Sequence, residues 1–296
     1  MAATEPGGTV ITPAVLRDWP LPEIAGNKEA RGRAVLVGGS VQNPGAIMLS
    51  AEAALRAGAG KAQLVAPEPV AVPIAIEIPE ALVQGGPVTA QGDLDASASN
   101  HAAEFCPQAD ATLIGPGLLD PDGAASLVAA CVPHVDSVLV LDALALAWAT
   151  QDPSRLQDFA GRCVISPNLT ELSIILGEDE ETVEADEAKY VRKLAKATGV
   201  VVTSGASTTW IATPDGDLWR GEGGGPGLGV SGSGDVKAGI ILGLCARGAD
   251  PVQAAVWGSY LHGSIGDRLA SKYGPYGFLS RELPGEIPQA LLEVGR

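Results

Sequence analysis

The sequence contains few residues of the types that build metal sites or disulfide frameworks. Its four cysteines are far apart with no C-x-x-C pair, and its three histidines are scattered: Cys106, Cys131, Cys163 and Cys245, and His101, His134 and His262. Such spacing indicates neither a zinc site nor a disulfide-bonded scaffold. We therefore expect reduced core thiols and histidines in structural roles, and we assign no metal-binding residue.

Net positive charge and long hydrophobic runs are also missing. The formal charge of −16 works against nonspecific binding to nucleic acid or to an acidic membrane surface. No stretch approaches the roughly 18 apolar residues of a membrane span, and the opening MAATEPGGTV has no basic region followed by an apolar core. We expect a cytoplasmic protein with no nucleic-acid or membrane partner, in which local backbone amides would hold any nucleotide.

Glycine, by contrast, is abundant in residues 223–248, which read GGGPGLGVSGSGDVKAGIILGLCARG. Apolar residues at helical spacing follow the glycines, so the pattern predicts a loop that turns into a helix at residues 231–235. Glycine lets backbone N–H groups approach a ligand closely, and the amides and dipole of a helix start favour an anion. Gly232, Ser233 and Gly234 are therefore the predicted anion hole.

Asp235 lies at the edge of this predicted anion hole and has two interpretations. It could be an ordinary helix cap or first-turn acid with no chemical role. A cap does not explain the eight glycines between positions 221 and 234, and the pattern matches neither G-x-x-x-x-G-K-[ST] nor G-x-G-x-x-G. We favour a catalytic base that takes a proton from a hydroxyl while the amides hold a transferring phosphoryl group.

Short apolar runs alternate with helical patterns along most of the chain, which predicts a three-layer α/β domain with a mostly parallel central sheet. A strand at 34–37, a helix at 46–58 and a strand at 62–65 form the clearest βαβ unit. Ligands of such sheets bind beyond the carboxyl ends of the strands. We expect one cleft, faced by Asp235 and lined by the loops at these ends: Gly38, Gly115, Asp142, Asn168 and Gly205.

The same patterns give the remaining elements and the domain organisation. We expect a partly flexible arm over residues 1–30 and a single domain over 31–296. Four prolines predict a broken segment at 67–79, and Asp142 after its strand is more often a helix cap than a ligand group. Further predictions are strands at 111–114, 138–141 and 163–166, helices at 99–105, 122–131, 169–176, 182–198, 251–272 and 288–294, and a hairpin at 208–220.

With these motifs assembled, the chain resembles the ribokinase-like superfamily, and within it the ADP-dependent (S)-NAD(P)H-hydrate dehydratases. The resemblance runs from about Gly32 to the C-terminus. It is carried by VLVGGSVQNPGA, ALRAGAGKAQLVAPE, ATLIGPGL, VLDALAL, SPNLTEL, SGAST, SGSGDVKAGIILGL and YLHGSIGD. The epimerase domain fused to some members does not fit ahead of Gly32, so if the organism has that activity, we expect another chain to carry it.

The resemblance implies a role for each matching position. Hydrated NADH or NADPH would contact Ala46 and Gly117, with Asp235 at its reacting part and Asn168 as a hydrogen-bonding partner. The nucleotide would lie against Gly234 and the turn of Ser204, Gly205, Ala206, Ser207 and Thr208. The implied reaction phosphorylates the ring hydroxyl and then eliminates phosphate, with ADP (or ATP) as co-substrate and Mg²⁺ on the phosphates. Relatives imply a homo-oligomer, a dimer or a tetramer.

Three positions depart from the family pattern. Asn168 stands where a histidine is usual, Ser204 where a lysine is usual, and Leu144 where a second acid is usual. These departures motivate two alternatives: a ribokinase-like kinase that phosphorylates a sugar or vitamin-like alcohol, and a non-catalytic nucleotide-binding homologue. An intact Gly-Ser-Gly-Asp run argues against the second of these.

Overall fold

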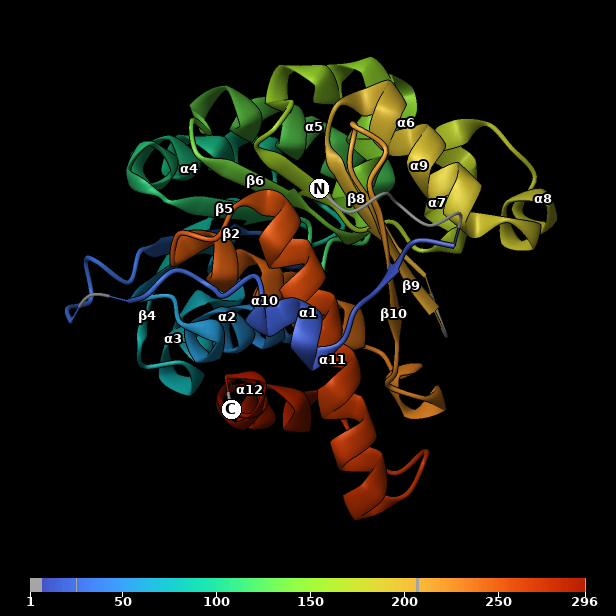
Figure 1. Ribbon diagram of the computed structural model, residues 1–296. Coiled ribbons are helices and arrows are strands. Elements are labelled where there is room, and N and C mark those ends of the chain that lie inside the picture. Colours follow the sequence, from blue (N-terminus) through green and yellow to red (C-terminus); the bar gives the residue numbers. More distant parts are fainter. Residues whose placement is uncertain (1–6, 25, 206–207, 296) are drawn as a thin grey trace.

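The computed structural model describes residues 7–24, 26–205 and 208–295. A single ten-stranded sheet forms the middle layer, in the order β1-β10-β9-β8-β7-β6-β5-β2-β3-β4. Helices cover both faces, with α2, α3, α10, α11 and α12 on one side and α4 to α9 on the other (Figure 1). The α/β class and the mostly parallel sheet predicted from the sequence are confirmed.

The strands are, in chain order, β1 (Thr9–Val10), β2 (Arg33–Val37), β3 (Lys61–Pro67), β4 (Ala81–Gly86), β5 (Ala111–Ile114), β6 (Val138–Leu141), β7 (Cys163–Ile165), β8 (Val201–Ser204), β9 (Thr208–Ala212) and β10 (Leu218–Glu222). The α-helices are α1 (Pro13–Arg17), α2 (Gly45–Ala57), α3 (Glu68–Glu77), α4 (Ser99–Phe105), α5 (Pro121–Cys131), α6 (Ala147–Gln151), α7 (Leu169–Leu176), α8 (Glu180–Ala185), α9 (Glu187–Thr198), α10 (Ser233–Ala246), α11 (Pro251–Tyr273) and α12 (Leu283–Val294). The predicted strands, the 208–220 hairpin and most predicted helices are confirmed.

Side chains of the central strands alternate between two hydrophobic cores. On β2, Ala34 and Leu36 belong to the core beneath α2, α10 and α11, whereas Val35 and Val37 belong to the core beneath α5, α7 and α9. A strand buried on both faces reads as a continuous apolar run, as parallel strands between two helix layers do. All four cysteines are free and buried, as expected of core thiols.

Strand direction explains where the cleft forms. Strands β2 to β8 pair in parallel, β9 and β10 make an antiparallel hairpin, and β1 joins the far edge in parallel with β10. The loops that follow β2, β5, β6, β7 and β8 therefore leave the sheet at one edge. Across the described residues, none of the helices combines the length and apolarity that a bilayer crossing needs.

Two predictions about proline were wrong. The segment expected to be broken contains α3, with Pro69 in its first turn and Pro73 inside it, and β4 follows. Proline is tolerated in a first turn because that N–H has no helical partner. Helix α12 likewise begins at Leu283, five residues before Pro288, where the prediction had started it. Apolar packing of these helices outweighs the loss of one backbone hydrogen bond at each internal proline.

The helix expected at 182–198 is two helices. Helix α8 ends at Ala185, and Asp186 has extended φ of −152°. Its side chain accepts a hydrogen bond from the N–H of Lys189, so it caps the start of α9. The amphipathic pattern continued across the break because both helices bury apolar residues against the same core.

Helix α10 is held unusually close to α2 by glycine. A Cβ at Gly239 would overlap the carbonyl oxygen of Ser50 and lie 2.8 Å from the Cβ of Ala53, and a Cβ at Gly243 would lie 2.8 Å from the Cα of Ala54. The small residues of α2 face these glycines, so the two backbones pack directly on each other. This packing fixes the position of the α10 N-terminus, where the sequence predicts the phosphate site.

Candidate active site

The glycine loop enters α10 through a left-handed residue. Gly232 is the N-cap residue, with φ of +90°, and no side chain caps this end of the helix. A Cβ at Gly232 would lie 2.6 Å from a methyl group of Leu49. The N–H of Ser233 donates to the carbonyl oxygen of Val230 at 3.1 Å, so the amides of Gly234 and Asp235 are the first-turn donors left for a ligand among the described residues. Asp235 does not cap the helix but is an acid of its first turn. The anion hole remains a prediction.

Asp235 lies in the first turn of α10, and the pKa of its carboxyl is unusually high. Burial raises the pKa of its carboxyl to about 7, and the negative charge of Asp142 adds to the effect. A carboxylate with a pKa near neutrality can accept a proton at physiological pH and still be a strong enough base to help a hydroxyl attack. This environment fits the proton acceptor predicted from the sequence.

The backbone of Asp235 is tied to α2. The hydroxyl of Ser50 donates to the carbonyl oxygen of Asp235 at 2.8 Å and to that of Ala46 at 3.2 Å. Gly117 lies at the same place, because a Cβ there would be 3.2 Å from the Cβ of Ala46. Ala46 and Gly117, two positions expected to contact substrate, are therefore adjacent to each other, and Ala46 lies one turn from the contact with Asp235.

A cavity of about 320 Å³ opens in front of Asp235, at the carboxyl ends of β6 and β7. It is lined by Asp142, Ala143, Ser166, Pro167, Asn168, Glu171, Gly205, Gly232, Gly234, Asp235 and Lys237. Three of the five predicted strand-end loops thus meet the glycine loop in one place. We call this space the reaction cavity.

Asp142 is not the helix cap that its position suggested. Its side chain makes no capping bond, is only 7% exposed, and accepts a hydrogen bond from the Ser166 hydroxyl. Burial raises the pKa of this carboxyl, whereas the bond from Ser166 and the charge of Lys237 lower it. The following residue, Ala143, has φ of +51°, a strained value for alanine. Strain and a buried acid are typical of functional sites.

Asn168 has a structural role that the resemblance did not imply. Its side-chain oxygen accepts from the N–H of Glu171 at 2.9 Å, and the Glu171 carboxylate accepts from the N–H of Asn168 at 2.9 Å. This capping box starts α7 and leaves Asn168 at the wall of the reaction cavity. Burial raises the pKa of Glu171 to about 7, so a second carboxyl titrates near neutrality here.

A second cavity, of about 560 Å³, also reaches the α10 N-terminus. Its lining includes Gly205, Thr209, Ser233, Gly234, Lys237, Ser259 and His262. We call it the nucleotide cavity because two positions expected to bind nucleotide, Gly205 and Gly234, line it. Ala206 and Ser207 lie outside the described residues. Thr208 begins β9 next to the cavity, and the buried hydroxyl of Ser204 donates to Glu187 at 2.9 Å.

His262 is a cavity residue that sequence reasoning missed. Its Nε2 atom and the Ser233 hydroxyl form a hydrogen bond of 2.9 Å. Burial lowers the pKa of His262 to about 3, and the nearby charge of Lys237 lowers it further, so the ring is neutral at physiological pH. The YLHGSIGD motif was a signal for this residue, but spacing alone could not bring it to Ser233, 29 positions earlier.

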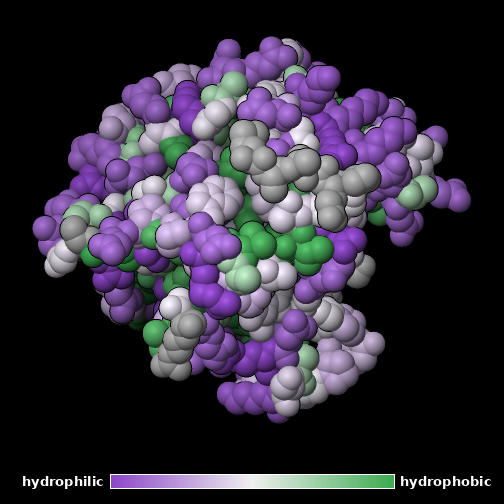
Figure 2. All heavy atoms as spheres, viewed as in Figure 1, coloured by the Kyte–Doolittle hydropathy of each residue, from purple (hydrophilic) through white to green (hydrophobic). Residues whose placement is uncertain are grey.

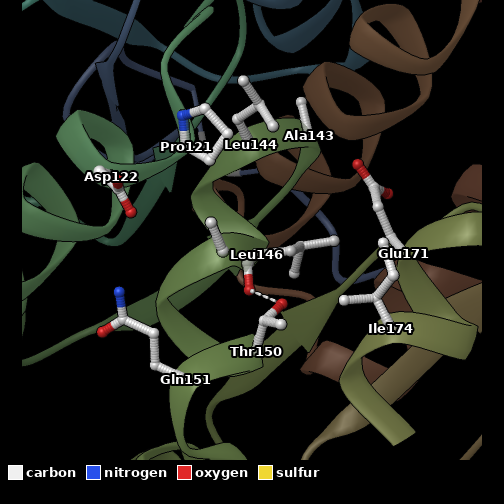
Figure 3. A pocket seen from close by; sticks show the side chains of 10 residues that line it. Pro121, Asp122, Ala143, Leu144, Leu146, Thr150, Gln151, Glu171 and Ile174 are labelled. Carbon is white, nitrogen blue, oxygen red and sulfur yellow. Dashed lines mark hydrogen bonds between the residues drawn. The ribbon is translucent and has the colours of Figure 1, made fainter. Parts of the chain in front are cut away.

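An apolar cavity of about 290 Å³ adjoins the reaction cavity and shares Ala143 and Glu171 with it. Leu144, Leu146 and Ile174 line it, and Figure 3 shows the Glu171 side chain extending from α7 toward the loop of Ala143. The hydroxyl of Thr150 is already bonded to the carbonyl of Leu146 at 3.1 Å. Leu144, where a second acid was expected, therefore belongs to an apolar wall.

Metal ligands are sparse in this site. In the described ranges, no three His, Cys, Asp or Glu side chains come together as a metal site. Mg²⁺ commonly takes only one or two carboxylates from a protein and completes its shell with phosphate oxygens and water. Asp142 has carboxylate lone pairs beyond the one that Ser166 occupies, so a magnesium ion carried by a nucleotide fits this site.

Comparison with solved structures defines the class of protein. The chain is similar to a ribokinase-like superfamily protein from Enterococcus faecalis V583, with a TM-score of 0.82, 24% identity and 99% of each chain covered. It is also similar to the ADP/ATP-dependent NAD(P)H-hydrate dehydratase from Bacillus subtilis co-crystallised with ATP/Mg²⁺, with a TM-score of 0.81, 26% identity, and coverage of 98% of this chain and 100% of the other. The fold is therefore ribokinase-like.

Sequence comparison defines the family. The NAD(P)H-hydrate dehydratase family matches residues 34–289. An ADP-dependent (S)-NAD(P)H-hydrate dehydratase from Xanthomonas campestris pv. campestris is 44% identical over 296 residues, which cover 99% of each protein. The chain belongs to the NAD(P)H-hydrate dehydratase family. It spans 51% of a bifunctional NAD(P)H-hydrate repair enzyme from Moorella thermoacetica that it also matches.

The resemblance inferred from the motifs is thereby confirmed. Neither the kinase alternative nor the non-catalytic alternative gains support from these matches. The assignment of individual site residues remains a prediction, which the geometry supports most directly at Asp235 and Gly234.

Proposed function

We propose that this protein is an ADP-dependent lyase that dehydrates (S)-NAD(P)H hydrate, restoring NADH or NADPH and forming AMP and phosphate. The observation that carries the proposal is the Asp235 carboxyl, whose pKa is raised to about 7 and which lies between open helix amides and a polar cavity. The full-length similarity to an ADP-dependent dehydratase supports the choice of substrate.

The residues at the start of α10 have separate roles in this mechanism. The nucleotide lies in the nucleotide cavity against Gly205, with its terminal phosphoryl group on the amides of Gly232 and Gly234 and beside Ser233, whose own N–H already donates to Val230. Asp235 takes the proton of the ring hydroxyl as that oxygen attacks phosphorus and AMP leaves. Loss of phosphate and a ring proton then re-forms the double bond of the reduced nicotinamide.

The remaining assignments follow from the shape of the cleft. The reacting ring lies in the reaction cavity beside Asn168, and the adjacent pair Ala46 and Gly117 contacts other parts of the substrate. Mg²⁺ bound with the phosphates would neutralise their charge, with Asp142 as the protein's nearest carboxylate donor. The B. subtilis relative crystallised with ATP/Mg²⁺ supports this expectation.

We also expect a homo-oligomer, a dimer or a tetramer. Val72, Ile76 and Leu82 expose 68%, 74% and 56% of their surfaces on α3 and on the edge strand β4, which suits a contact between copies. The face in Figure 2 is mostly hydrophilic. Because ADP and hydrated nicotinamide cofactors are its proposed substrates, we expect the protein to act in the cytoplasm. Its buried free thiols also stay reduced there.

One assay tests the proposal. Purified protein is given hydrated NADH with ADP or ATP and Mg²⁺, and recovery of reduced-nicotinamide absorbance is followed together with formation of AMP. Recovery coupled to AMP formation is the expected result. Nucleotide turnover only with another alcohol, or binding without turnover, would contradict it.

A further inference from the structure

The nucleotide cavity and the reaction cavity meet at three shared residues. Gly205, Gly234 and Lys237 line both, and Lys237 is the one of the three with a side chain. A phosphoryl group moving from nucleotide to substrate must pass through the place where the two cavities join. The proposed function thus requires that this group travel past Lys237.

We infer that the Lys237 ammonium group binds the terminal phosphoryl group of the nucleotide and stays with it during transfer. This inference rests on the proposed function and adds a cation to the predicted anion hole. Neither the sequence motifs nor the family resemblance assigned a role to Lys237.

The position of Lys237 on α10 suits this role. It lies four residues after Ser233 and so shares its face of the helix, one turn beyond the open amides. The Ser233 hydroxyl is hydrogen-bonded to His262, whose ring is neutral and therefore does not repel a cation. Lysine at this point extends the amide site with a mobile charge that can follow a moving phosphoryl group.

Three carboxylates surround Lys237, and each already has another partner. Asp142 accepts from Ser166, Glu171 accepts from the Asn168 N–H, and Glu187 accepts from Ser204. All three act on Lys237 electrostatically from three separate elements, and none forms an ion pair with it among the described residues. Burial lowers the pKa of Lys237, and the three carboxylates oppose that shift by favouring the charged amine. They leave its three N–H donors available.

A partly buried ammonium group without a direct partner loses hydration free energy, and a bound anion would compensate for that loss. The phosphoryl oxygens of a nucleotide supply both the charge and the acceptors. In a chain of formal charge −16, two anionic substrates cannot be held by the overall field. Lys237 provides a local positive charge at the point where phosphate must bind.

If Lys237 contacts only the transferred phosphoryl group of the nucleotide, the two nucleotides should respond differently to its loss. ADP carries that phosphoryl group and AMP lacks it, so Lys237 should distinguish the donor from its product. Removing the charge should weaken ADP binding and transfer while leaving AMP binding almost unchanged. A lysine needed only for folding would affect both nucleotides equally.

The experiment compares Lys237→Met and Lys237→Arg with the wild type, using calorimetric titration of ADP and AMP at fixed Mg²⁺. We expect Lys237→Met to weaken ADP binding at least about tenfold and AMP binding less than about twofold, and to lower kcat in the repair assay. Lys237→Arg should recover most of the ADP affinity, because it keeps the charge. Lys196→Met, at an exposed position of α9, is the matched control and should change nothing.

Equal losses for ADP and AMP, or no loss for ADP, would overturn the inference. Melting temperatures are measured for every variant, and Lys237→Gln replaces Lys237→Met if the latter unfolds. A wild type that binds ADP but does not restore hydrated NADH would contradict the proposed function, while the ADP-to-AMP comparison would still decide the role of Lys237.

Discussion

At the residue scale, the site depends on carboxyl groups held in surroundings that resist negative charge. Asp235 and Glu171 both have pKa values raised to about 7 by burial. By contrast, hydrogen bonds lower the pKa of the exposed acids Glu29 and Asp95. Asp142, buried beside the first two, adds its own charge to the field at Asp235. Proton transfer near neutral pH is therefore a property of this cavity and of no single residue in isolation.

Replacing Asp235 by asparagine should remove turnover and spare nucleotide binding. The amide has nearly the same shape but cannot accept the hydroxyl proton, so we expect kcat to fall by about 10²- to 10⁴-fold. ADP affinity should stay within about twofold of wild type, because the amides of α10 remain. The matched control is Asp215→Asn, in the exposed turn between β9 and β10. A near-normal rate for Asp235→Asn would exclude the role of base.

Activity should depend on pH through Asp235. The base works when ionised, so kcat/KM should fall as pH drops below its pKa of about 7 and should level off above it. Because the charge of Asp142 helps to raise that pKa, Asp142→Asn should move the profile to lower pH. A profile of kcat/KM against pH for both proteins measures the shift, and a shift to higher pH would contradict the assignment.

At the scale of elements, α10 and α2 form one unit. Their contact depends on Gly239 and Gly243, which the sequence pattern placed in an apolar helix without indicating what lay opposite. The Ser50 hydroxyl adds a polar link at the end nearest the site. The position of the anion hole is therefore set by helix packing as well as by the glycine loop.

Gly239→Ala should destabilise the protein by about 1–3 kcal/mol, since the added methyl group forces the helices apart. Urea unfolding measures the loss. Gly285→Ala in α12 is the matched control, because a Cβ there meets nothing within 4 Å. That control should be neutral or stabilising by up to about 1 kcal/mol, as alanine favours a helix. Equal stabilities for the two variants would contradict the packing described.

Local patterns predicted local structure well and spatial partners poorly. The strands at 111–114 and 138–141 and the helix at 169–176 have the bounds that the sequence indicated, because apolar periodicity and flanking turns act within a few residues. Asp142 was taken for a cap because its partner Ser166 lies 24 positions away. Lys237 and His262 were missed for the same reason: their significance comes from neighbours contributed by other elements.

At the scale of the whole molecule, the N-terminal segment adds an edge strand to the sheet and packs on its neighbours. Strand β1 extends the edge beside β10, and Trp19 stacks on Trp219 with ring centroids 6.3 Å apart. The carbonyl of Trp19 accepts hydrogen bonds from Gln253 and Trp257 of α11. Residues from the start of the chain thus join the hairpin to a core helix, far from Asp235 in the sequence.

Trp19→Ala should lower stability and leave catalysis intact. Loss of a partly buried indole that packs on the core should cost about 2–3 kcal/mol, somewhat less than a fully buried tryptophan. Urea unfolding gives the stability, and the repair assay at 25 °C gives the rate. Trp19→Phe should recover part of the loss, because it keeps an aromatic ring against Trp219. A reduced rate without a change in stability would contradict this division of roles.

The direct backbone contact between α2 and α10 also limits how the enzyme can move. Two helices whose main chains touch cannot slide past each other without atomic overlap. The wall of the cleft that carries Ala46 and Asp235 is therefore rigid. Any closing motion around bound ligands then falls to the other walls of the two cavities, which include the loop leading into α7 at Asn168 and strand β9 at Thr209.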